Sequence, residues 1–153
     1  MSFNSCCFSG HRNISIKNTE IASAVIDKII LLYNDGCRDF YVGGALGFDM
    51  LATIMLVSLK NKGFDLKIHF VLPSRDYNKR WSKSDRQMQE YLQTFAYETV
   101  YMGEKYFSGC NHMRNRYMVD NSDCLIAYLK EYKGGTYYTY KYAKENEKEI
   151  ILI

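Results

Sequence analysis

The sequence predicts an α/β fold, a Rossmann-like three-layer sandwich in which helices cover both faces of a mostly parallel central sheet. Two observations support this prediction. Short apolar runs alternate with segments of helical spacing along the chain, and several of these runs end directly at glycine or proline. Strands that are apolar throughout and are joined by helices form a parallel sheet buried on both faces. Because 153 residues suffice for one core and no linker or repeat interrupts them, we expect residues 1–153 to form a single domain.

The first half of the chain is expected to supply three strands and two helices. The strands are apolar runs that end at Gly10, Gly43 and Pro73, and the helices carry apolar residues three and four positions apart. Glycine follows each of the two helices and provides a stop signal. The expected strands are 5–9, 39–42 and 66–72, and the expected helices are 19–33 and 48–61.

The second half of the chain continues the same alternation after a polar and basic segment that covers residues 74–85. Apolar runs again mark the strands, and a glycine pair opens the last helix. The expected helices are 82–95, 110–119 and 134–146, and the expected strands are 98–101, 124–128 and 148–153.

Composition narrows the class of protein. The net charge of +3 is mild, whereas nucleic-acid binders usually carry a strong basic stripe, so a nucleic-acid partner is not expected. The five cysteines are odd in number and lack CxxC spacing, which favours free thiols in a reducing compartment over disulfides or a zinc site. Neither a signal peptide nor an apolar run long enough to span a membrane is present, so we expect a cytoplasmic protein with no membrane partner.

Candidate ligand residues follow the ends of the predicted strands, because ligands of open parallel sheets bind beyond the carboxyl ends of the strands. Two of these strand ends carry glycine loops that open helices. Helix N-termini present unpaired N–H groups and a positive dipole end, which suit phosphate. The candidates at strand ends are Ser9, Gly10, His11, Arg12, Gly43, Gly44, Ala45, Gly47, Asp49, Pro73, Arg75, Gly134, Gly135 and Thr136.

The loop from Gly43 to Asp49 reads Gly-Gly-Ala-Leu-Gly-Phe-Asp and matches neither the dinucleotide fingerprint nor a Walker A loop. Two interpretations are open. The glycines can allow close packing of helix against strand, or they can let the backbone approach a bound anion. A second glycine loop, Gly134 to Thr136, at another strand end of the same small chain favours the ligand cradle.

Three side chains near these loops are candidates for direct contact with a ligand. Asp49 lies in the first turn of its helix, where it can interact with the helix dipole, contact ribose hydroxyls or act as an acid or base. His11 is either a polar surface group or a ligand contact, and its place at a strand end favours contact. Arg12 offers a fork of donors for phosphate.

Two further segments have both a structural and a functional interpretation. Basic residues, Arg75 among them, precede Trp81, which either anchors a solvated loop or belongs to a mobile segment whose Trp81 or Tyr77 stacks on a base. Arg114 and Asn115 are either solvated helix residues or ligand contacts. No cluster of histidine, cysteine and aspartate has metal-ligand spacing, so neither a metal nor a cofactor is expected.

Five short segments resemble, in order, the YpsA-like branch of the SLOG superfamily. The resemblance implies a Rossmann-like fold with a ligand pocket above the strand ends. Members of the wider superfamily include the Lonely Guy phosphoribohydrolases, the DNA-processing protein DprA and sensor domains for ADP-ribose-derived signals. The matching segments are 7–12, 43–49, 81–86, 114–123 and 134–136, and they span nearly the whole chain.

The sequence departs from the PGGxGTxxE motif of the Lonely Guy enzymes. No proline precedes Gly43, Phe48 stands where threonine is usual, and the catalytic glutamate is absent at the matching spacing, with Asp49 the nearest carboxylate. The resemblance therefore favours a sensor or sequestering protein for a nucleotide-derived small molecule, of ADP-ribose type or a cyclic nucleotide. The alternatives are a nucleoside-monophosphate N-glycosidase that uses Asp49 and a DNA-associated protein similar to DprA. The resemblance also implies a homo-oligomer, a dimer or larger.

Overall fold

Six strands and five helices alternate along residues 3–153, which is the part of the chain that the computed structural model describes. The expected α/β architecture is confirmed, and the expected boundaries hold to within two residues. The elements are β1 (Ser5–Gly10), α1 (Thr19–Asn34), β2 (Asp39–Val42), α2 (Phe48–Asn61), β3 (Lys67–Leu72), α3 (Lys83–Gln93), β4 (Ala96–Tyr101), α4 (Cys110–Asp120), β5 (Cys124–Tyr128), α5 (Gly134–Glu145) and β6 (Glu149–Leu152).

The strands form one sheet in the order β4-β3-β2-β1-β5-β6, and every neighbouring pair is parallel. The chain adds strands in one direction from β1 to β4 and then crosses over to place β5 on the other side of β1. Neighbouring strands with connections leaving in opposite directions open a crevice at their carboxyl ends. The fold therefore places a crevice beyond the ends of β1 and β5.

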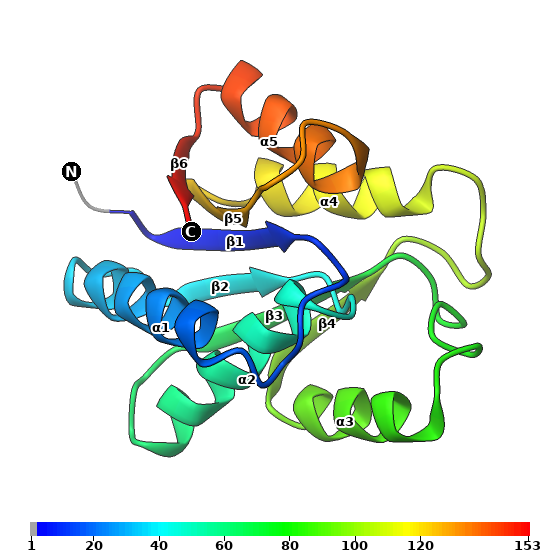
Figure 1. Ribbon diagram of the computed structural model, residues 1–153, viewed down its shortest axis with the longest axis horizontal. Helices are drawn as coiled ribbons and strands as arrows, with labels where there is room; N and C mark the ends of the chain where they lie inside the picture. Colours follow the sequence, from blue (N-terminus) through cyan, green and yellow to red (C-terminus); the bar gives the residue numbers. More distant parts are fainter. Residues whose placement is uncertain (1–2) are drawn as a thin grey trace.

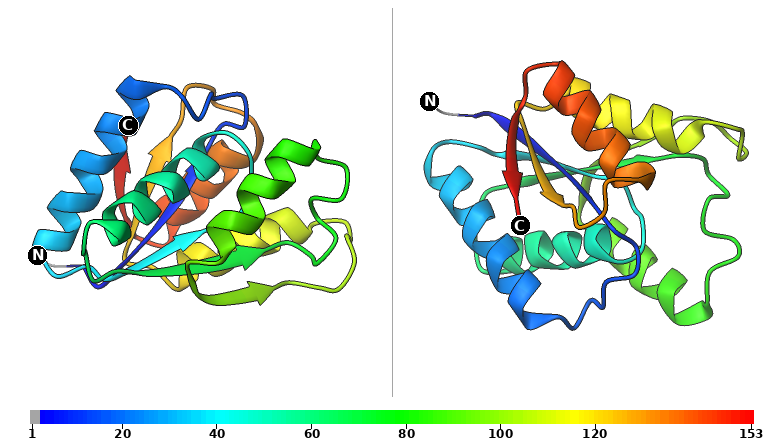
Figure 2. Two further views of the ribbon diagram at one scale, coloured as in Figure 1. Left: turned by 90° about the horizontal axis from the view of Figure 1, so that it is seen from below. Right: turned by 45° about the horizontal axis from the view of Figure 1, so that its top comes forward.

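Helices cover both faces of this sheet (Figure 1). Helices α1, α2 and α3 lie on one face and α4 and α5 on the other, and a turned view shows α4 and α5 side by side (Figure 2). Successive residues of β1 serve the two layers in turn, because side chains alternate along a strand. Phe8 packs into the core with Leu51 of α2, whereas Cys7 packs with Met118 of α4.

All five cysteines are free and buried. Cys6 and Cys124 face each other on β1 and β5 with their sulfurs 3.6 Å apart. Burial raises the pKa of the Cys7 thiol to about 12, so this side chain behaves as a small apolar residue. Within residues 3–153, no helix combines the length and the apolar character that crossing a membrane requires.

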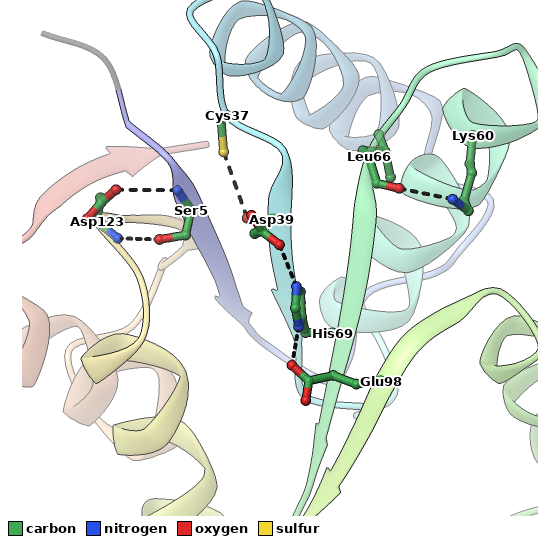
Figure 3. A network of polar contacts seen from close by, with 8 residues as sticks. All are labelled: Ser5, Cys37, Asp39, Lys60, Leu66, His69, Glu98 and Asp123. Atoms are coloured by element: carbon green, nitrogen blue, oxygen red, sulfur yellow. Dashed lines mark hydrogen bonds and ion pairs between the residues drawn. The ribbon is translucent and has the colours of Figure 1, made fainter.

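A buried histidine joins three neighbouring strands on the face that carries α4 (Figure 3). His69 of β3 contacts Asp39 of β2 through Nε2 at 2.7 Å and Glu98 of β4 through Nδ1 at 2.5 Å. A register shift beside His69 leaves Tyr97 as an extra residue in β4 and brings Glu98 opposite the ring. Two carboxylates therefore lie within hydrogen-bond distance of one imidazole ring. The tyrosine ring of Tyr41 stacks on the imidazole with centroids 4.4 Å apart.

We predict that His69→Phe lowers the free energy of unfolding by about 1–2 kcal/mol, because it keeps an aromatic ring but leaves Asp39 and Glu98 without their donor. Urea denaturation of purified protein measures the change. The same substitution in an Asp39→Asn, Glu98→Gln background should cost less than half as much. Equal costs in the two backgrounds would show that the hydrogen bonds to Asp39 and Glu98 do not account for the loss of stability.

Candidate functional site

A cavity of about 660 Å³ opens at the carboxyl ends of β1 and β5, where the topology places the crevice. Four segments form its walls: the end of β1 with the loop after it, the loop after β2 with the first turn of α2, one face of α4, and residues 131–136 that lead into α5. Twelve of the residues expected from the sequence lie here together. They are Ser9, Gly10, His11, Arg12, Gly43, Ala45, Asp49, Arg114, Asn115, Gly134, Gly135 and Thr136.

The cavity also has walls that the sequence interpretation missed. Asn111 and Met118 lie three and four positions from Arg114 and Asn115, on the same face of α4, so helical spacing alone could have added them. His112 of the same helix also lines the cavity. Glu131 and Lys133 come from the segment between β5 and α5, and no signal of spacing or composition singled them out.

The residues expected at the end of β3 lie elsewhere. Pro73, Arg75 and Trp81 are not among the residues that line the cavity. Arg75 contacts Glu104 at 3.0 Å and lies over the ring of Tyr101, while Trp81 packs edge-on against Tyr77 beside the core. Contact between these three residues and a ligand stays a prediction.

The glycine loop after β2 is folded around the carboxylate of Asp49. The backbone N–H of Gly43 donates to Oδ2 at 3.0 Å and to Oδ1 at 3.2 Å, and the N–H of Ala45 donates to Oδ2 at 3.0 Å. Asp49 is 4% exposed. Burial raises the pKa of its carboxyl, and the charge of Arg114 and the loop amides oppose that shift. The amides that could have cradled a phosphate are therefore occupied by a carboxylate of the chain itself.

Gly47 allows this loop to pass close to the β1 loop. Its φ of 77° is unfavourable for other residues, and a Cβ here would overlap the backbone carbonyl of Arg12. The N–H of Phe48 donates to the carbonyl of His11 at 3.1 Å, which joins the start of α2 to the same loop. Gly47 thus has the packing role that was one of the two open interpretations, although it does not itself line the cavity.

Arg114 is a buried cation in the wall of the cavity, 4% exposed. Its Nη1 donates to the carbonyl of Gly43, its Nε to Oδ1 of Asn115 at 2.7 Å, and its Nη2 to Oδ1 of Asn111 at 3.2 Å. Burial lowers the pKa of Arg114 and the charge of Asp49 opposes the shift, but a guanidinium stays protonated in proteins. The site therefore keeps a fixed positive charge away from bulk water.

His11 joins the two strand ends at the switch point. Its Nε2 accepts a hydrogen bond from the N–H of Lys130 at 2.8 Å, and its ring packs edge-on against Tyr128. Because Nε2 accepts, the ring in this arrangement is neutral and Nδ1 carries the proton. His11 therefore positions the loop that leads into α5 and retains one N–H.

The N-terminus of α5 opens into this cavity without a side-chain cap. The cap residue Lys133 makes no side-chain capping bond, and the first turn contains no acidic residue. Gly134 has a φ of 86°, whereas Gly135 has ordinary backbone angles and open space where a Cβ would lie. The first amides of a helix lack intrahelical partners and lie at the positive end of its dipole. Among residues 3–153, no group of three or more histidine, cysteine, aspartate or glutamate residues could hold a metal ion.

Comparison with solved structures places this fold in a known class. DNA processing protein A from Helicobacter pylori, described for its single-stranded DNA binding mode, aligns with 97% of this chain at a TM-score of 0.70 and 20% identity. DprA from Streptococcus pneumoniae aligns with 98% of this chain at the same TM-score and identity. This chain spans only 64% and 50% of those two chains, and identities this low show the fold alone. The class is that of Rossmann-like α/β proteins.

Sequence comparison gives the family. The family model YpsA, described as the YspA SLOG family, matches residues 6–152, and this chain therefore belongs to that family. The uncharacterized SPbeta prophage-derived protein YoqJ of Bacillus subtilis is 31% identical over 134 residues, which cover 80% of this chain and 77% of YoqJ. The UPF0398 protein YpsA of the same organism is 24% identical over 132 residues, covering 84% and 73%. The resemblance found in the sequence is confirmed.

We predict that Asp49→Ala lowers the free energy of unfolding by at least about 2 kcal/mol, because it leaves the amides of Gly43 and Ala45 without an acceptor. Urea denaturation measures the loss. Asp49→Asn is the matched control, since its one remaining oxygen can still accept and its loss should be smaller. An Asp49→Ala protein as stable as the unchanged chain would contradict the holding role of this carboxylate.

Proposed function

We propose that this protein binds a phosphorylated, nucleotide-derived small molecule, of ADP-ribose type or a cyclic nucleotide, in the cavity at the ends of β1 and β5, and that it acts as a sensor or a sequestering protein. The observation that carries the proposal is the uncapped N-terminus of α5, which opens into the same cavity as the buried guanidinium of Arg114. A helix N-terminus next to a fixed cation favours a phosphate group.

Charges around the cavity support an anionic ligand. Arg12 and Lys133 are exposed cations on its rim, and Arg114 lies in its wall. The charge of Asp49 is balanced in part by the loop amides and by Arg114. Glu131 is the other acid of the lining, and a carboxylate at such a rim can accept hydrogen bonds from ribose hydroxyls or an amino group.

The asparagine side chains of α4 favour a ligand that has hydrogen-bonding groups in addition to its phosphate. The side-chain oxygens of Asn111 and Asn115 accept from Arg114, which leaves each NH₂ group free to donate within the cavity. His11 offers a further donor at Nδ1. These groups suit the hydroxyls and ring acceptors of a nucleotide.

The N-glycosidase alternative assigns Asp49 the role of catalytic acid or base. Both oxygens of this carboxylate accept from backbone amides, and a group so engaged is poorly placed to activate water on a sugar. The geometry therefore supports binding without turnover. A cytoplasmic protein is part of this proposal, because free thiols suit a reducing compartment.

We predict that Gly135→Asp weakens binding of ADP-ribose and AMP by about tenfold or more, because it places a carboxylate where the phosphate would lie. The open space at this position lets the chain fold, and an acid in the first turn should stabilise α5 slightly. Isothermal titration calorimetry measures affinity, and thermal unfolding measures stability. Gly135→Asn is the matched neutral control and should bind more tightly than Gly135→Asp.

A panel of nucleotides tests the proposal itself. We expect ADP-ribose, AMP or a cyclic nucleotide to bind and unphosphorylated adenosine to bind far more weakly. The proposal fails if the unchanged protein binds none of the phosphorylated compounds. Release of ribose 5-phosphate from AMP that is lost in Asp49→Asn would instead support the hydrolase alternative.

A further inference from the structure

A second hollow, of about 580 Å³, lies along α4 and shares only His112 with the lining of the ligand cavity. Its floor is one helical face, since the residues that contribute recur at three- and four-residue spacing along α4. Met102 from the segment after β4 and Tyr138 from α5 form its two sides. The helix contributes Gly109, His112, Met113, Arg116, Tyr117 and Asp120.

Two neighbouring positions of α4 depart from the pattern of an ordinary surface helix. Arg114, a charged residue, points inward and is 4% exposed, whereas Met113 points outward and is 48% exposed. Tyr138 beside it is 38% exposed. A surface helix normally turns its polar residues to water, and exposed apolar patches rimmed by polar groups mark interaction sites.

Two opposite charges lie one helical turn apart on this outer face. Arg116 and Asp120 are both exposed, and neither takes part in an ion pair within residues 3–153. Side chains of α5 hold both in place. Tyr142 donates its hydroxyl hydrogen to Oδ1 of Asp120 at 2.7 Å, and the guanidinium of Arg116 donates to the hydroxyl of Tyr138 and lies 5.5 Å from the ring centroid of Tyr142.

We propose that this outer face of α4 is the contact between two copies of the chain. In the assembly, the two α4 helices run antiparallel about a two-fold axis, and Arg116 of each copy pairs with Asp120 of the partner subunit. Met113, Tyr117 and Tyr138 supply the apolar part of the contact. Across a two-fold axis, if residue i of one copy contacts residue j of the other, then j of the first also contacts i of the second. A surface with a cation and an anion one helical turn apart can therefore pair with a second copy of itself.

The charge pattern favours a second copy over other occupants. A strongly acidic or basic partner would be matched by charges of one sign, and this face carries both. The exposed aromatic and methionine side chains between them are the residue types enriched in the centre of protein interfaces. The proposal uses none of the residues assigned to phosphate binding, so either proposal can fail without the other.

Charge reversal tests the pairing through the molecular mass of the whole chain, measured by size-exclusion chromatography with light scattering and by sedimentation at several concentrations. We expect the unchanged protein to form dimers. Arg116→Asp and Asp120→Arg should each raise the dimer Kd by about a hundredfold, because each places like charges opposite each other. An equimolar mixture of the two variants should form heterodimers, and the double variant with both substitutions should dimerise again.

A matched control and a second variant guard against effects on folding. Lys17→Asp changes the charge by the same amount as Arg116→Asp, at an exposed residue just before α1 and outside the proposed contact, and should leave the dimer intact. Met113→Glu should also weaken the dimer, because it places a charge in the apolar part of the contact. Circular dichroism checks that each variant is folded.

Three results would overturn the proposal. The first is an unchanged protein that is monomeric throughout the micromolar range. The second is a dimer that survives both single reversals and Met113→Glu. The third is a pair of folded, monomeric reversal variants that do not associate when mixed, since the pairing predicts that their charges match.

Discussion

The backbone of Gly43 contacts a buried charge through both its N–H and its carbonyl, and the geometry of the site depends on these two contacts. Its N–H donates to Asp49 of α2, and its carbonyl accepts from Arg114 of α4. These helices lie on opposite faces of the sheet, so the backbone of one residue joins both layers to the end of β2 (Figure 1). Each charge is almost fully buried and needs such partners, because an uncompensated buried charge is strongly destabilising.

This arrangement gives two similar glycine loops different electrostatic roles. In the loop after β2, the amides are satisfied by Asp49, so the loop is a rigid wall of the cavity. In the loop before α5, Lys133 leaves the helix N-terminus uncapped, and the first turn contains no carboxylate. Both loops have the composition of a phosphate cradle. The position of one acidic side chain decides which of them has amides left for a ligand.

Sequence reasoning could predict the strand and helix alternation and the gathering of strand ends, because parallel strands direct their carboxyl ends to one edge of the sheet. It could not predict the strand order. In the sheet, β1 and β2 separate β3 from β5, so the segment after β3 lies away from the cavity. In that segment, Arg75 packs on Tyr101 and Trp81 packs on Tyr77. Nor could spacing decide that Asp49 turns back onto its own loop, since the dipole and ligand interpretations require the same residue at the same position.

Helix α4 resists interpretation from its sequence because it serves two surfaces with opposite requirements. Its inner face carries Arg114 and two asparagines for the cavity, and its outer face carries Met113 and Tyr117, so no simple apolar stripe identifies the buried side. The inner face is anchored through Arg114 to the carbonyl of Gly43. A ligand that acts on Arg114 and a second copy that acts on Arg116 would bind to the same eleven-residue helix. If both proposals hold and either event moves that helix, linkage requires each to change the affinity of the other by the same factor.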